Sequence, residues 1–163
     1  MNEDLNSKKI DFAKNILEQN SNLIRLIDTK AGLILGSAGI ILGLLSFFDH
    51  SLVAKNTEYA LFATVTFLGA TMIFSFLTIF PRTTSKAKTE TAIFYESIIQ
   101  QTEEEYSKTI DILTCEKIIA DYARNIHSLA RVQKRKFSTL RMSLVLMMIS
   151  VGSLMVTLYC YFA

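Results

Sequence analysis

Three long stretches without a charged side chain constrain this chain more than any other feature of its sequence. They are Ala31–Phe48, Tyr59–Phe80 and Met142–Phe162, which are 18, 22 and 21 residues long and contain no Asp, Glu, Lys, Arg or His. A helix needs about 20 apolar residues to cross the hydrocarbon core of a bilayer, and Leu26 and Ile27 extend the first stretch. We therefore expect an all-α membrane protein with three transmembrane helices, rather than a soluble fold around a buried hairpin.

The basic residues predict how these spans are oriented. Five Lys and Arg residues precede span one, eleven lie between spans two and three, and the loop between spans one and two holds only Lys55. Because Lys and Arg concentrate in cytoplasmic segments, we expect a multi-pass protein with a cytoplasmic N-terminus. The chain is then one membrane domain, 1–163. It comprises an N-terminal stem (1–30), span one (31–48), span two (59–80), a cytosolic helical segment (82–141) and span three (142–162).

The cytosolic parts show helical signals. Apolar residues recur at three- and four-residue spacing before span one and again from Ile119 to Leu140, with Gln133 as the one polar member of the second face. Thr102 followed by Glu105 is typical of a capping box at a helix start. These patterns predict long helical stems that run into spans one and three without a break and pack on each other.

Small and weakly polar residues line one face of each span. In span one they are glycines at spacings of four, three and four, namely Gly32, Gly36, Gly39 and Gly43. Such faces let helix backbones approach closely in lipid, and we expect them to pack helices within the chain. Self-assembly or a water-filled path are the alternatives. No ionisable residue lies inside a span, which argues against a proton-coupled transporter or a charge-selective pore.

The sequence gives little support for catalysis or for a metal. No nucleophile is paired with a base, and no glycine-rich loop is present to hold a phosphate. Two cysteines, Cys115 and Cys160, and two histidines do not form a metal-ligand set. Acids are interspersed with the bases, so no nucleic-acid stripe emerges. We predict a protein that is not an enzyme, uses no cofactor or metal, and has membrane lipids as partners.

Asp28 is harder to explain than the bases around it. Juxtamembrane Lys and Arg side chains orient the protein, and they could also hold lipid headgroups or an anionic ligand. Acids contribute little to orientation, and yet Asp28 lies three residues before the first apolar run. We expect it to pair with a base at the same depth on another segment, either Arg82, Arg135 or Lys136.

Five short motifs occur in order along the chain: IDTKAG (27–32), FPRT (80–83), IFYESI (93–98), EEEY (103–106) and IHSLARVQKRKF (126–137). Together they resemble the transmembrane effector family of Pycsar anti-phage systems, over about residues 15 to 155. The SLATT group of membrane effectors shares the general plan. The positions that match the family's motifs are Asp28, Lys30, Ala31, Pro81, Arg82, Phe94, Tyr95, Tyr106, Arg135 and Lys136.

The resemblance implies an inner-membrane effector that responds to cyclic UMP or cyclic CMP made by a partner pyrimidine nucleotide cyclase. The response implied is impairment of the membrane, and we expect it to involve a homo-oligomer. A few bases and a stacking aromatic ring would suffice for such a ligand. The candidates are Lys30, Arg82, Tyr95, Arg135 and Lys136. A holin-like constitutive pore former and a helical membrane adaptor are the alternative functions.

Overall fold

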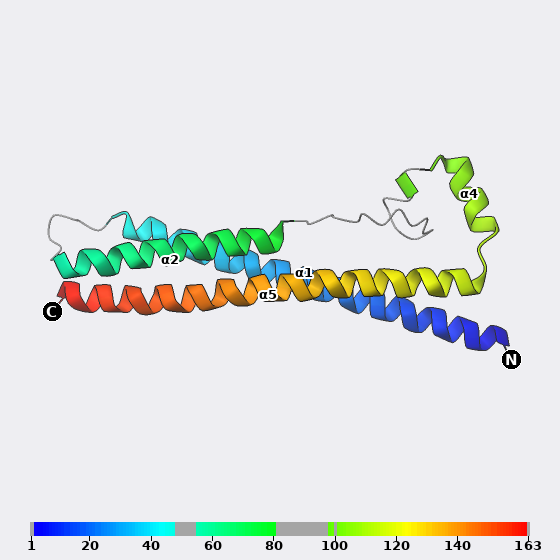
Figure 1. Cartoon of the computed structure of the whole chain (residues 1–163), viewed down its shortest axis with the longest axis horizontal. Coiled ribbons are helices and arrows are strands. Elements are labelled where there is room, and N and C mark those ends of the chain that lie inside the picture. The colour runs from blue at the N-terminus through cyan, green and yellow to red at the C-terminus, as the bar shows by residue number, and fades with distance from the viewer. Residues whose placement is uncertain (1, 48–54, 81–97, 100, 163) are drawn as a thin grey trace. The chain divides into compact units, whose positions relative to one another are not determined.

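Helices make up almost all of the structure, a computed structural model that describes residues 2–47, 55–80, 98–99 and 101–162. Within these ranges the long elements are α1 (Asn2–Leu45), α2 (Lys55–Ile79), α4 (Glu103–Asp111) and α5 (Cys115–Phe162), and no strand is present (Figure 1). Helices α1, α2 and α5 are long and apolar enough to cross a membrane. The predicted fold class, all-α with three membrane-spanning helices, is confirmed.

Two of the helices are much longer than a bilayer requires. Helix α1 has 44 residues and α5 has 48, more than twice the number that crosses a hydrocarbon core. Neither is interrupted within its bounds, so each contains a span and the stem that leads into it. Helix α1 ends at Leu45, after which the Ser46 hydroxyl donates a hydrogen bond to the carbonyl oxygen of Gly43 at 2.6 Å.

The short helix α4 begins at the predicted capping box. The Thr102 backbone N–H donates to Glu105 Oε2 at 2.9 Å, and the Glu105 N–H donates to Thr102 Oγ1 at 3.3 Å. The bond from the Thr102 backbone is the main cause that lowers the pKa of the Glu105 carboxyl, and the Thr102 side chain adds to it. These reciprocal bonds satisfy two backbone groups that the helix start would otherwise leave open.

The chain forms two compact units. One unit comprises Met1–Ile24 and Arg82–Gln133; the other, which we call the span unit, comprises Arg25–Pro81 and Lys134–Ala163. The first unit has a partly polar interior, since Asp121 and Asn125 are buried there together with Ala13. The span unit contains the three charge-free stretches and is therefore the part of the chain that can cross a membrane.

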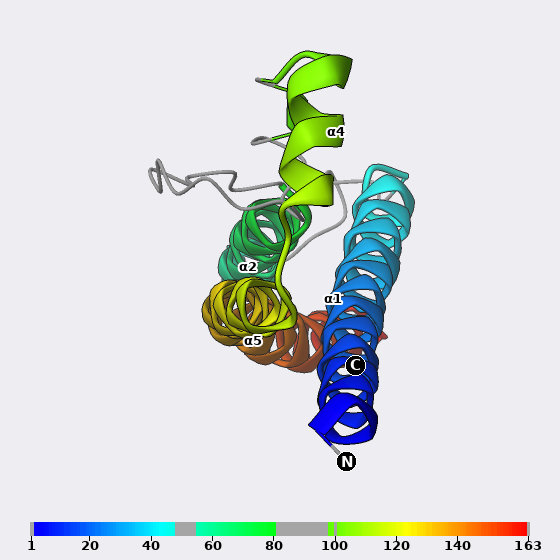
Figure 2. The ribbon, with the colours of Figure 1, turned by 90° about the vertical axis from the view of Figure 1, so that its right-hand side faces the viewer.

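Apolar side chains pack the span unit at two levels. Near its charged end, Ile27 and Ala31 of α1 pack with Leu140 of α5. Deeper in the unit, Ala38 and Leu45 of α1 pack with Leu68 of α2. All of these residues are less than a tenth exposed. Two views show α2, in green, running beside the orange and red half of α5 (Figures 1 and 2).

A line of hydroxyl groups joins α2 to α5, and we call it the hydroxyl seam. Its paired oxygens lie 2.6 to 2.9 Å apart. The pairs are Thr78 with Thr139, Ser75 with Ser143, and Thr64 with Ser153. Positions descend along α2 as they ascend along α5, so the two helices are antiparallel and the seam fixes their register.

The seam also satisfies backbone groups. Ser143 donates to the carbonyl oxygen of Thr71 at 3.4 Å, and Ser153 donates to that of Ala60 at 3.1 Å. The hydroxyl stripes of the second and third spans thus face each other inside the chain. This is the intramolecular packing that their spacing predicted.

Replacing Ser143 with Leu tests the seam. Ser143 is fully buried, so a larger side chain has to push α2 and α5 apart, and we expect a loss of about 2 kcal/mol of stability. The matched control is Ser37→Leu, because Ser37 is exposed on α1 and bonds only to the carbonyl of Leu33 in its own helix. Unfolding of both variants by SDS, followed by circular dichroism, measures the difference. Equal stability would mean that α2 and α5 do not pack through Ser143.

Candidate functional site

The candidate site lies where the charge-free part of α1 begins. Asp28 is one residue beyond Ile27 and three before Ala31, two residues that are almost fully buried against α5. Residues three and four apart share one helix face, so Asp28 is carried on the edge of the packed face. Its side chain is 33% exposed. The fold of α1 therefore aims this carboxylate at α5.

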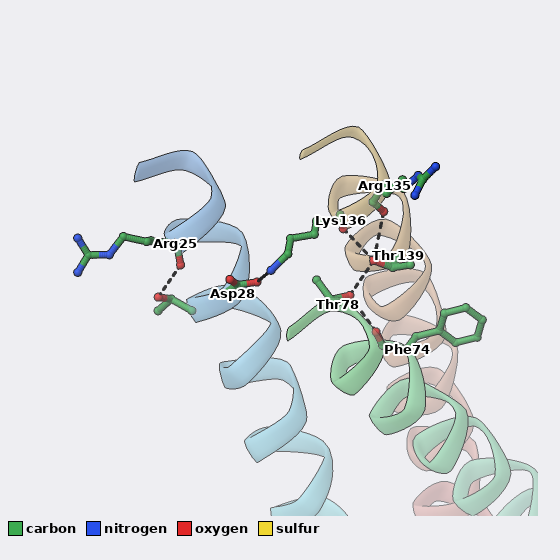
Figure 3. Close-up of polar contacts among 8 residues, drawn as sticks. Arg25, Asp28, Phe74, Thr78, Arg135, Lys136 and Thr139 are labelled. Atoms are coloured by element: carbon green, nitrogen blue, oxygen red, sulfur yellow. Dashed lines mark hydrogen bonds and ion pairs between the residues drawn. The ribbon is translucent and has the colours of Figure 1, made fainter. Parts of the chain in front are cut away.

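Lys136 of α5 meets this carboxylate. Its Nζ donates to Asp28 Oδ1 at 2.5 Å, and the Lys136 side chain is only 13% exposed (Figure 3). Lys136 lies one turn before Leu140, so the same face of α5 carries the ammonium and the apolar contact to α1. Of the three bases considered for Asp28, the structure places Lys136 beside it. A carboxylate next to the hydrocarbon layer is thereby neutralised.

Thr139 attaches the third helix at the same level. Its hydroxyl donates to the backbone oxygen of Lys136 at 3.0 Å or to that of Arg135 at 3.3 Å. The Thr78 hydroxyl of α2 lies 2.9 Å from Thr139 Oγ1 and 2.8 Å from the carbonyl oxygen of Phe74 (Figure 3). One turn of α5 thus contacts α1 through Lys136 and α2 through Thr139.

The sequence analysis did not single out Thr139, although a signal for it exists. Within the charge-free run of the third span, the stripe of small and weakly polar residues begins at Ser143. Thr139 lies four residues earlier and extends that stripe by one helical turn, on the same face. It was missed because it lies among the basic residues just outside the apolar run.

The other predicted ligand residues are not gathered into one pocket by the described part of the structure. Lys30 and Arg135 are exposed, and neither side chain makes an ion pair there. Arg82 and Tyr95 lie outside the described residues, as do Pro81 and Phe94 of the family motifs. Ala31, another motif position, is fully buried. The described site is the ion pair with exposed bases around it, and the described residues include no cluster of possible metal ligands.

The glycine face of α1 lies beside this arrangement without contributing to it. Gly32, Gly36 and Gly43 are exposed and Gly39 is half-buried. A methyl group added at any of the four would meet no atom within 4 Å. Helix α1 packs in its own unit through Ala31, Ala38 and Leu45 instead. Within the described residues these glycines are not packed against another helix, so the packing within the chain that we expected of them stays a prediction.

Comparison with known families identifies the chain. A family model described as the Pycsar effector protein domain matches residues 12–163. The chain belongs to the Pycsar effector family. No curated protein and no solved structure matches it.

The family match and the fold agree on a membrane protein. The family match covers the three helices that are apolar and long enough to span a bilayer, from residue 12 of α1 onward. This Pycsar effector is therefore a multi-pass membrane protein of antiviral defence, as the five motifs implied. The ion pair between Asp28 and Lys136 lies within two of those motifs, IDTKAG and IHSLARVQKRKF, which accounts for charged residues at this depth in both.

A double-mutant cycle tests the coupling between α1 and α5. Asp28→Asn and Lys136→Gln each leave one charge without its partner. The losses in unfolding free energy of the two single variants should therefore add up to more than the loss of the double variant. We expect a coupling energy of about 1 kcal/mol, measured by unfolding in detergent.

The control for this cycle is the exposed pair of Asp4 and Lys8 in α1. Their charged atoms lie 2.8 Å apart, but both side chains are about 70% exposed. Their coupling should be about 0.3 kcal/mol. A coupling at Asp28 and Lys136 no larger than this would contradict a structural role for the pair.

Proposed function

We propose that this Pycsar effector impairs the inner membrane of an infected cell when it binds a cyclic pyrimidine nucleotide. The nucleotide, cyclic UMP or cyclic CMP, is the product of a partner cyclase. Family membership and three membrane-spanning helices support the proposal. Its main structural support is the ion pair between Asp28 and Lys136. This pair joins the N-terminal ends of spans one and three, and an anion can compete with Asp28 for the Lys136 ammonium.

The ligand's chemistry suits the residues at this end of the spans. A cyclic nucleotide has one phosphate charge and one flat base, so it needs a cation and a stacking ring. Lys30 and Arg135 offer exposed cations, and Arg82 and Tyr95 are the further candidates. Lys136 is already engaged by Asp28, so a phosphate would have to displace that carboxylate. Because of this competition, the ligand would bind more tightly when Asp28 and Lys136 are apart than when they are paired. A ligand can shift an equilibrium between two arrangements only if it binds one of them more tightly.

We further propose that the response includes assembly of several copies through the glycine face of α1. The face is open along Gly32, Gly36 and Gly43, and small residues at this spacing favour close helix contacts in lipid. The excess of bases on one side of the spans supports a cytoplasmic N-terminus, which would expose the stems to a nucleotide made in the cytosol.

Dye release from proteoliposomes tests this function. We expect cyclic UMP or cyclic CMP to raise the release rate of the full-length protein by about tenfold, within the usual range of allosteric coupling. Cyclic AMP, a purine nucleotide, should have no effect. Arg135→Gln should raise the nucleotide concentration needed for half-maximal release by about tenfold, because a bond to a charged group is lost.

Gly36→Leu is the matched variant for assembly. It should keep its helix content, since the position is open in the single chain, and it should lose nucleotide-dependent release. Absence of release with either pyrimidine nucleotide would contradict the proposal. Equal release without any nucleotide would instead indicate a constitutive pore former.

A further inference from the structure

Exposed basic residues surround one end of the span unit, and we call them the basic girdle. They lie on the last turns of α1 before its charge-free run and on the corresponding turns of α5. All five side chains are exposed. The basic girdle consists of Arg25, Lys30, Lys134, Arg135 and Arg141.

The girdle's charge is not balanced by acids of its own two segments. Segments 25–30 and 134–141 hold six basic residues and one acid, a net charge of +5. The acid, Asp28, is already paired with Lys136. Among the residues that the structure describes, no girdle side chain makes an ion pair. The girdle is therefore a strongly positive surface that can attract anions from outside the chain.

The depth of the girdle matches one layer of a bilayer. Lys134 and Arg141 are seven residues apart, which is about 10 Å along a helix. The headgroup region on each side of a bilayer is about 5 to 8 Å thick, and Lys and Arg side chains reach several ångströms along a helix toward it. Arg141 directly precedes the charge-free run of α5, and Lys30 directly precedes that of α1. All five charges can reach headgroups of the same leaflet.

The directions of the side chains indicate whether the girdle suits one small anion or several lipid headgroups. Arg25 and Lys30 are five residues apart, which separates them by about 140° around α1. Arg135 and Arg141 are separated by about 120° around α5. Arg25 and Arg135 point to opposite sides, away from the ion pair (Figure 3). The five bases therefore do not all converge on a single phosphate, but as a set they suit separate phosphates around a perimeter.

We propose that the basic girdle binds anionic phospholipid headgroups, so that this effector gathers lipids such as phosphatidylglycerol around one end of its spans. The interaction does not require the nucleotide proposed above. Free phosphate could bind the same cations by the same chemistry, but the divergent directions of the side chains favour headgroups. Each base near an anionic surface raises the association constant by up to about fivefold.

Lipid selectivity measured by electron paramagnetic resonance tests the girdle. The full-length protein is placed in phosphatidylcholine bilayers without nucleotide, with spin-labelled phosphatidylglycerol or phosphatidylcholine as the probe. We expect phosphatidylglycerol to be preferred at the protein surface by about threefold. The variant R25Q/K134Q/R141Q should lose most of that preference. It leaves Lys30 and Arg135, the candidate nucleotide residues, unchanged.

Two control variants keep the test independent of folding. K9Q/K14Q/K117Q removes the same charge from exposed lysines of the other unit and should keep the preference. R25K/K134R/R141K keeps the girdle's charge and should also keep it. The proposal is overturned if the wild type shows no preference, or if R25Q/K134Q/R141Q retains it in full. It is equally overturned if millimolar inorganic phosphate at constant ionic strength abolishes the preference, since that would indicate a free-phosphate site.

Discussion

A polar group in the hydrocarbon core of a bilayer finds no water to bond with, and the buried hydroxyl contacts of the span unit meet that constraint inside the protein. The helices satisfy their own backbone groups. The hydroxyl groups of α2 and α5 satisfy one another, as Ser75 and Ser143 do at 2.6 Å, or bond to a carbonyl of their own helix. Asp28, at the edge of the apolar layer, meets Lys136. Because such partners have to be found inside the protein, they fix helix register more strongly than interchangeable apolar contacts do.

The same constraint arranges the contacts that the proposed function uses. Residues 136–140 of α5 provide an ammonium for α1, a hydroxyl for α2 and an apolar side chain for the core, so one turn and a half of helix holds all three spans together. The bases left over are exposed and unpaired in the described structure. We propose that they serve anions from outside: headgroups around the perimeter, and a nucleotide phosphate that competes with Asp28. A ligand acting there would alter the packing of the spans directly.

Sequence reasoning predicted the parts of this arrangement that depend on one helix at a time. The three spans, the continuous stems, the capping box at Thr102 and the facing hydroxyl stripes all follow from spacing along a single segment. The partner of Asp28 did not follow, because three bases lay at a compatible depth and the rotation of α5 decides which of them faces α1. For the same reason the sequence did not indicate that α1 packs through Ala31 and Ala38 while Gly36 on another face stays open. The spacing of residues shows which of them share a helix face, but the position of the neighbouring helix determines whether that face is packed or open.

We propose that the stems lie in the cytosol and that α5 crosses the membrane once, and the two natural cysteines allow a test of this topology. Cys115 at the start of α5 and Cys160 near its end are both free and exposed. In spheroplasts, a membrane-impermeant maleimide should label Cys160 and should reach Cys115 only after the membrane is permeabilised, with C115S and C160S variants assigning each signal. Labelling of Cys115 in intact spheroplasts, or protection of both cysteines until permeabilisation, would contradict this topology.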